Sequence, residues 1–146
     1  MPTVIATADI AAPLEKVYAI SRNIEAFPQF MPDVQEVEIL EQRPGYQRSR
    51  WVGIVKEFKR TINWTEEDYW DDENHSCTFE QTEGDFSEYR GAWRFSESDG
   101  VTRAELEVTY EYDVPLIGNL IKALLKRKMQ ENTDNMLAAI KQEAEK

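Results

Sequence analysis

The last fifth of the chain, from Pro115 to Lys146, constrains the fold more than any other segment. After Gly118 it contains no further glycine or proline, and residues with high helix propensity dominate it. The sequence therefore predicts one long helix from Leu116 to about Glu143, roughly 40 Å in length. The other segments with helical character are short, so this helix needs a β-sheet against which to bury its apolar side.

The apolar side of the predicted helix changes direction about halfway along. At roughly 100° per residue, the apolar residues of its N-terminal half form one cluster, and those of its C-terminal half form another, rotated by more than ~90°. We expect the second cluster to anchor the helix on the sheet, and the first to face the loop 27–32 and a ligand. The first contains Leu116, Ile117, Leu120, Ile121 and Leu124, and the second Met129, Met136, Leu137, Ile140 and Ala144.

The segments before this helix alternate between apolar and polar residues, as β-strands do. A first strand is expected from Val4 to Ile10, and Pro13 then suits the start of a short helix, Leu14–Ile20. A second short helix is expected around Ile24–Phe27. The later strands are predicted at Val34–Glu41, Gln47–Val55, Phe58–Tyr69, His75–Thr82, Phe86–Phe95 and Thr102–Tyr112.

The order of these elements predicts an α+β fold. Short turns join the later strands, including an Asp99-Gly100 hairpin signal, so neighbouring strands pair antiparallel. A curved antiparallel sheet of seven strands is expected to wrap around the C-terminal helix, with two short helices after the first strand. The length of 146 residues, with no linker or internal repeat, favours a single domain spanning residues 1–146.

The chain is strongly acidic, with a formal net charge of −11. This charge repels phosphate groups, so we expect no nucleic-acid partner. A single cysteine and an N-terminus without a signal-peptide pattern favour a cytoplasmic protein. His75 and Cys77 would lie about 6.6 Å apart on one strand, too far for direct proton transfer. With one histidine and no ligand spacing typical of metal sites, we expect no metal and no cofactor.

Large apolar side chains are the candidate lining of a ligand cavity between the sheet and the long helix. An ordinary packed core needs such residues too. However, many of the candidates are tryptophans and tyrosines, whose polar ends are typical of small-molecule sites. The candidates are Phe27, Phe30, Trp51, Trp64, Phe79, Tyr89, Trp93, Leu106, Val108, Tyr110, Tyr112, Ile117, Leu120, Ile121 and Leu124.

Arginines occur inside several of the predicted strands. Arg60 is the candidate best suited to hold a ligand oxygen, because it shares a strand face with Ile62 and Trp64. The alternative is a pairing with a glutamate on the outer face of the sheet, which is more common for arginine. The acidic run Asp68–Glu73 is interpreted as a solvated turn, because its spacing fits no calcium loop.

Four basic residues lie within seven positions of the predicted helix. Together with the apolar residues of its N-terminal half, they suit a transient contact with an anionic membrane surface. The alternative is a solvated basic face near acidic strand residues. The four are Lys122, Lys126, Arg127 and Lys128.

Three stretches of the sequence resemble a known family. They are Ala12-Pro13-Leu14-Glu15-Lys16-Val17-Tyr18 followed by residues 24–32, then Gly91-Ala92-Trp93-Arg94-Phe95, and finally Tyr110-Glu111-Tyr112 followed by Pro115-Leu116-Ile117-Gly118. In this order the chain resembles the polyketide cyclase/dehydrase and coenzyme-Q-binding branch of the START-like (helix-grip, SRPBCC) superfamily. The resemblance covers essentially the whole chain. It implies a helix-grip fold with a deep apolar cavity between the sheet and the C-terminal helix.

The resemblance implies binding more than any one reaction. We expect a carrier or presenter of a hydrophobic small molecule such as a lipid, a polyprenyl quinone or a polycyclic aromatic. One alternative is a polyketide cyclase or aromatase, in which Arg60 and a tyrosine such as Tyr110 would polarise ligand carbonyls. Another is a protein-interaction role, as in toxin-like relatives.

Overall fold

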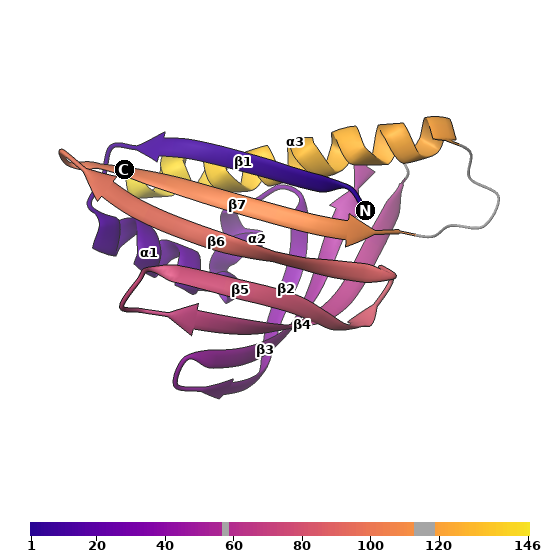
Figure 1. The fold of residues 1–146 in the computed structure, drawn as a ribbon, viewed down its shortest axis with the longest axis horizontal. Coiled ribbons are helices and arrows are strands. Elements are labelled where there is room, and N and C mark those ends of the chain that lie inside the picture. The colour runs from indigo at the N-terminus through magenta and orange to yellow at the C-terminus, as the bar shows by residue number, and fades with distance from the viewer. Residues whose placement is uncertain (57–58, 113–118) are drawn as a thin grey trace.

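Seven antiparallel strands form one sheet in the order β1-β7-β6-β5-β4-β3-β2. The computed structural model describes residues 1–56, 59–112 and 119–146 (Figure 1). The helical elements are α1 (Leu14–Arg22), the 3-10 turn η1 (Ile24–Ala26), α2 (Phe27–Phe30) and α3 (Asn119–Ala144). The strands are β1 (Thr3–Ile10), β2 (Val34–Arg43), β3 (Tyr46–Val55), β4 (Arg60–Asp71), β5 (Ser76–Gly84), β6 (Glu88–Ser98) and β7 (Val101–Glu111). The predicted helix-grip fold is confirmed.

The first and last strands lie side by side in the sheet. Val4 of β1 is paired with Val108 of β7. From β2 to β7, each strand neighbours the next one in the chain, whereas α1, η1 and α2 carry the chain from β1 to the opposite edge of the sheet. The short helices therefore cross between the two edges beside α3, which runs along β1 (Figure 1).

The β6–β7 hairpin forms at the predicted Asp99-Gly100 turn. The φ angles of Asp99 and Gly100 are 52° and 80°. Two successive positive φ angles belong to a type I′ turn, whose twist matches that of the flanking strands. Nothing lies within 4 Å of the position that a Cβ of Gly100 would occupy, so backbone conformation is what favours glycine there.

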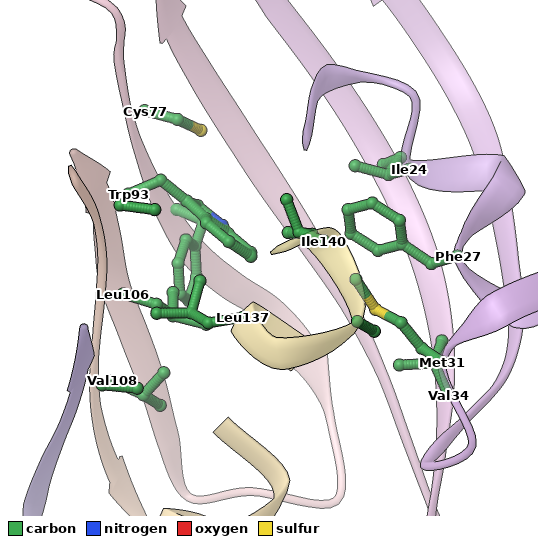
Figure 2. Packing of buried hydrophobic residues seen from close by; sticks show 14 of the residues in the cluster. Ile24, Phe27, Met31, Val34, Cys77, Trp93, Leu106, Val108, Leu137 and Ile140 are labelled. Atoms are coloured by element: carbon green, nitrogen blue, oxygen red, sulfur yellow. The ribbon is translucent and has the colours of Figure 1, made fainter. Parts of the chain in front are cut away.

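Side chains of the C-terminal half of α3 fill the space between the sheet and the short helices. Leu137 and Ile140 are 1% and 0% exposed. Figure 2 shows Leu137 pointing toward Leu106, and Ile140 between Trp93 and Phe27. This half of the helix anchors α3, as its apolar pattern predicts.

Polar contacts hold α3 along the edge strand β1. Gln130 Nε2 donates to the carbonyl oxygen of Ile5 at 2.9 Å, and Lys141 Nζ donates to that of Asp9 at 2.6 Å. These bonds satisfy backbone oxygens that an edge strand would otherwise leave open to another chain. They also fix the helix over the inner face of the sheet.

The N-terminal part of α3 is its exposed part. Leu120 is 83% exposed and Ile121 36% exposed. The predicted helix start at Leu116 lies outside the described residues. Within those residues, Leu120 and Ile121 of the apolar cluster expected to face a ligand are exposed to solvent instead, and Leu124 is half-buried.

The prediction that the N-terminal half of α3 faces the loop 27–32 is wrong for the described residues. Figure 2 places Phe27 and Met31 beside Ile140, in the C-terminal half of α3. The loop that follows α2 is bonded to the same region, because Asn135 Nδ2 donates to Asp33 Oδ2 at 2.9 Å. Strand β1 sets the position of α3, and helical periodicity alone does not contain that information.

Candidate ligand-binding cavity

A cavity of about 80 Å³ lies between α3 and the inner face of the sheet. Strands β3, β4, β6 and β7 supply most of its wall, and the middle of α3 closes it. The lining residues are Asp33, Val34, Trp51, Gly53, Ile54, Val55, Ile62, Trp64, Glu66, Phe79, Phe86, Tyr89, Trp93, Leu106, Val108, Met129, Asn132, Thr133 and Met136.

Aromatic side chains form much of the cavity wall. Trp51 of β3 and Trp64 of β4 are directly opposite each other, and their rings stack with centroids 5.8 Å apart. Tyr89 of β6 packs against Trp64 at 5.0 Å and against Phe86 at 4.6 Å. Flat apolar walls with a few polar atoms are typical of sites for hydrophobic small molecules.

A row of buried polar side chains continues from the stacked tryptophans. Ser49 is paired with Glu66, and Gln47 with Asp68, in the register of β3 and β4. All four residues are at most 4% exposed. Glu66 lines the cavity, whereas Asp68 lies two residues further along β4 and outside the lining.

Hydrogen bonds connect this row to the aromatic wall. Trp64 Nε1 donates to Glu66 Oε1 at 2.7 Å. Trp51 Nε1 donates to Ser49 Oγ at 2.8 Å, and Ser49 Oγ donates to Asp68 Oδ2 at 2.9 Å. Both indole N–H groups of the stacked pair are therefore satisfied, and each one ends at a carboxyl group, directly or through Ser49.

The two buried acids raise the pKa values of their neighbourhood and both have raised pKa values themselves. Burial raises the pKa of Glu66 well above its usual value, the negative charge of Asp68 and a hydrogen bond with it raise that pKa further, and the Trp64 indole opposes the shift. Burial also raises the pKa of Asp68, against the hydrogen bonds from Glu66 and Ser49. These effects favour the protonated, neutral form of Glu66, the acid that lines the cavity.

Other titratable groups nearby also stay neutral. Burial raises the pKa of Tyr89, and the nearby acids Glu66 and Asp68 add to the effect. Burial raises the pKa of the Cys77 thiol, and Asp68 and Glu66 raise it further. Cys77 is therefore not a thiolate nucleophile. Burial raises the pKa of Tyr110 to about 12, and its hydroxyl has no hydrogen-bond partner in the described residues.

Comparison with known proteins identifies the family. Residues 10–137 match the family described as polyketide cyclase / dehydrase and lipid transport. The chain belongs to this family. Membership of the polyketide cyclase/dehydrase and lipid transport family supports a role in binding a hydrophobic small molecule, in agreement with the aromatic cavity.

Relatives of this family member include bacterial proteins that are named as toxins. The ribosome association toxin RatA of Escherichia coli K12 is 26% identical over 144 residues, which cover 95% of this chain and 84% of RatA. The persistence and stress-resistance toxin PasT of Escherichia coli O6:H1 (strain CFT073) is also 26% identical over the same shares of the two chains.

Solved structures of similar proteins share the whole fold. TTHA0849 from Thermus thermophilus is 34% identical, with a TM-score of 0.93 over 98% of this chain and 97% of that one. The ZhuI aromatase/cyclase from Streptomyces sp. R1128 is 23% identical, with a TM-score of 0.90 over 99% of this chain and 93% of that one. At the lower identity, the likeness concerns the fold alone.

The predicted ligand residues of this family member separate into three groups. Those on the inner face of the sheet line the cavity, and they are Trp51, Trp64, Phe79, Tyr89, Trp93, Leu106 and Val108. A second group lies in the core or packs against it, outside the lining: Phe27, Phe30, Tyr110 and Tyr112.

The third group lies away from the cavity. Arg60 is exposed, so the expectation that it points inward is wrong. Leu120, Ile121 and Leu124 lie outside the lining, because the helix meets the cavity one to four turns later, at Met129–Met136. Ile117 lies outside the described residues.

The polar row is what sequence reasoning missed. Asp68 was assigned to a solvated turn, yet it is 3% exposed. The signal was available, because Glu66 and Asp68 continue the inward alternation of Ile62 and Trp64 toward the buried Trp70. Two acids at the inward-facing positions of a strand, between apolar residues, indicate buried polar side chains in the cavity wall rather than a solvated segment.

The predicted basic cluster is only partly exposed. Lys122, Lys126 and Arg127 are exposed, whereas Lys128 is buried and donates to Glu131 Oε2 at 3.0 Å. None of the helices in residues 1–56, 59–112 and 119–146 is long and apolar enough to cross a membrane. Over the same residues, no three histidine, cysteine, aspartate or glutamate side chains come together as metal ligands.

Proposed function

We propose that the protein carries or presents a hydrophobic small molecule, which it binds between α3 and the inner face of the sheet. Residues 1–146 act as one binding domain in the cytoplasm. The observation that carries the proposal is the cavity wall itself, in which aromatic rings surround the buried carboxyl group of Glu66. Lipids, polyprenyl quinones and polycyclic aromatics all suit such a wall.

The size of the cavity implies that it widens when a ligand binds. Its volume of about 80 Å³ is below the ~150 Å³ of a cavity that holds benzene. Two of the α3 residues in the wall are Met129 and Met136, whose unbranched side chains repack more easily than branched ones. We propose that these methionines rotate, and that α3 shifts relative to β3 and β4, to admit a larger ligand.

Mass spectrometry of organic extracts tests this proposal. Protein purified without detergent should release a hydrophobic compound in near-stoichiometric amount. Val108→Phe, which fills the cavity, should release at least several-fold less. Val101→Phe is the matched control, because Val101 lies on the same strand, is 40% exposed and lies outside the lining. Equal extracts from both variants, or none from the native protein at any expression level, would contradict the proposal.

A polyketide cyclase or aromatase is a second candidate. It is favoured by the neutral Glu66 carboxyl group in the cavity, since a buried acid that keeps its proton suits proton transfer to a carbonyl oxygen. The exposed Arg60 has no part in this candidate. Turnover of a poly-ketone thioester that is lost in Glu66→Leu would support it, and an unchanged rate in that variant would remove it.

A toxin-like interaction is a third candidate, favoured by the likeness to RatA along 95% of the chain. The net charge of −11 opposes docking on RNA, so such an interaction would involve a protein surface. Sedimentation with purified ribosomal subunits tests it. Comigration that persists at 0.5 M salt would support the interaction, and its absence at low salt would remove it.

A further inference from the structure

The middle of α3 closes the cavity from one side, and the two flanks of the helix are held differently. Gln130 and Lys141 donate to backbone oxygens of the edge strand β1. At roughly 100° per residue, Asn132 and Asn135 lie about 200° and 140° around the helix from Gln130, on the flank turned away from β1. That second flank meets the loop between α2 and β2.

Asp33, in that loop, joins the second flank of α3 to the sheet. Asn135 Nδ2 donates to Asp33 Oδ2 at 2.9 Å. In the amide orientation that satisfies both ends of its side chain, Asn132 donates to the same oxygen at 3.2 Å. The backbone oxygen of Asp33 accepts from the N–H of Ile54 on β3 at 3.0 Å. Asp33 therefore bridges α3 and β3, and the two bonds from Asn132 and Asn135 are called the Asp33 clasp.

The Asp33 clasp lies where the cavity wall reaches the surface. Most of the lining is buried, but the lining residues at the clasp and next to it are half-buried, so this part of the wall is in contact with solvent. They are Asp33, Gly53, Ile54, Asn132 and Met136. The gap between α3 and β3 is therefore the route from solvent to the cavity that the clasp spans.

A competing entrance lies at two other half-buried residues of the lining, Trp64 and Tyr89. Their rings pack on each other with centroids 5.0 Å apart, and both pack on Phe86, at 5.7 and 4.6 Å. Opening the wall there would separate three aromatic rings and expose their surface to water. That costs more than breaking two hydrogen bonds near the surface, so the clasp is the favoured entrance.

We infer that the mouth of the cavity lies between α3 and β3, and that the Asp33 clasp controls how fast a ligand passes through it. This inference rests on the proposed function, because it assigns an entrance to the same cavity. The helix moves about its attachment to β1, the two amides leave Asp33, and the clasp forms again once the ligand is inside. Since the clasp is closed in the free protein and in the complex, it sets the rates of binding and not the affinity.

Stopped-flow binding of N-phenyl-1-naphthylamine, a neutral fluorescent probe, tests the inference. Asp33→Ala removes the acceptor of both amides, so the association and dissociation rate constants should each rise about tenfold, as the loss of two net hydrogen bonds provides. The dissociation constant should stay within about twofold of the native value, because both rates change together. Asp33→Asn keeps an acceptor oxygen in place, so its rates should stay within about threefold of the native ones.

Further variants assign the effect to the clasp. Asn135→Ala removes one donor and should raise both rate constants about threefold. Adding it to Asp33→Ala should change nothing more, because the two substitutions remove the same hydrogen bond. Glu36→Ala is the matched control, since it removes a nearby acid whose partner is Arg50 of β3, and it should behave like the native protein. Near-UV circular dichroism confirms that each variant is folded.

Acrylamide quenching of tryptophan fluorescence follows the opening of the mouth without a bound ligand. Trp51 lines the cavity and is 5% exposed, so the quencher reaches its ring through the mouth. Asp33→Ala should be quenched more strongly than the native protein, and Glu36→Ala should be quenched equally.

Each outcome bears on the inference. Faster entry and exit at unchanged affinity in Asp33→Ala supports it. Unchanged rates in that variant, or a change in one rate constant alone, overturn it while leaving the proposed function intact. If the probe does not bind the native protein, the proposed function fails, and the quenching experiment still decides on the clasp. Stronger quenching in Asp33→Ala then supports the mouth between α3 and β3, and equal quenching overturns it.

Discussion

Trp64 and Glu66 lie two residues apart on β4, and the indole N–H of Trp64 donates to Glu66 Oε1 at 2.7 Å. Both residues line the cavity. The ring therefore supplies apolar surface and also fixes the orientation of the buried Glu66 carboxyl group in the wall. A hydrophobic cavity with an oriented acid is the central feature of this molecule.

Replacing Glu66 should change how stability depends on pH. The pKa of Glu66 is raised in the folded protein, so the folded state holds a proton that the unfolded chain releases above about pH 4.3. Native stability should therefore fall as the pH rises from that value toward the folded pKa, by up to ~1.4 kcal/mol per pH unit for this proton. Glu66→Gln should remove this decline, measured by urea unfolding between pH 5 and pH 8.

The matched control for this measurement is Glu67→Gln. It makes the same change of charge on the same strand, outside the cavity lining. It should retain the native decline. Parallel stability profiles for the native protein and Glu66→Gln would contradict the assignment of a proton to Glu66.

The two halves of α3 should contribute unequally to stability. Leu137→Ala should lower the free energy of unfolding by about 3 kcal/mol, because Leu137 is 1% exposed. Leu120→Ala should change it by less than ~0.5 kcal/mol, because Leu120 is 83% exposed. Urea unfolding at pH 7 measures both, and equal losses would contradict the placement of the helix.

Gly91 should tolerate no side chain. A Cβ at this position would lie 2.0 Å from the carbonyl oxygen of Glu107 on β7 and 2.6 Å from the ring of Phe79. Gly91→Ala should therefore cost about 2–3 kcal/mol, since backbone must move to make room. Gly100→Ala, where only the positive φ is unfavourable, should cost about 1 kcal/mol. Thermal unfolding of both variants checks the order, and the reverse order would refute the crowding at Gly91.

The sequence was sufficient to predict the fold, because the relevant patterns are local. Alternation marks the strands, the Asp99-Gly100 turn marks a hairpin, and the absence of glycine and proline after Gly118 marks the long helix. The exact first and last residues of the strands are harder to predict from the sequence. β6 begins at Glu88, two residues after the predicted Phe86, because Phe86 bends out of the strand to pack on Trp64 and Tyr89.

The cavity was only partly accessible from sequence. The inward positions of the strands follow from alternation, so Trp51, Trp64 and Leu106 were predicted as lining candidates. The part of α3 that closes the cavity depends on how the helix lies along β1, which no local pattern encodes. Glu66 was overlooked because charged residues are seldom buried, although its position on β4 shares a face with Trp64.

If the exposed start of α3 contacts an anionic membrane, as we propose from its exposed leucine, isoleucine and basic residues, neutralising the charges should weaken that contact. Each of Lys122→Gln, Lys126→Gln and Arg127→Gln should lower binding to vesicles with 30% phosphatidylserine by about fivefold, since each charge near the surface contributes ~1 kcal/mol. Lys146→Gln, at the other end of the helix, is the control. Sedimentation that does not depend on anionic lipid would end this idea.

The most direct test of the ligand cavity uses the four tryptophans of the chain as internal reporters. Trp51, Trp64 and Trp93 line the cavity, whereas Trp70 is buried outside it. Titration with ethylbenzene, followed in ¹H–¹⁵N spectra of the indole N–H groups, should shift the Trp51, Trp64 and Trp93 resonances at saturation and leave Trp70 in place. Resonances that all stay in place, or a shift of Trp70 alone, would contradict a binding site between α3 and the sheet.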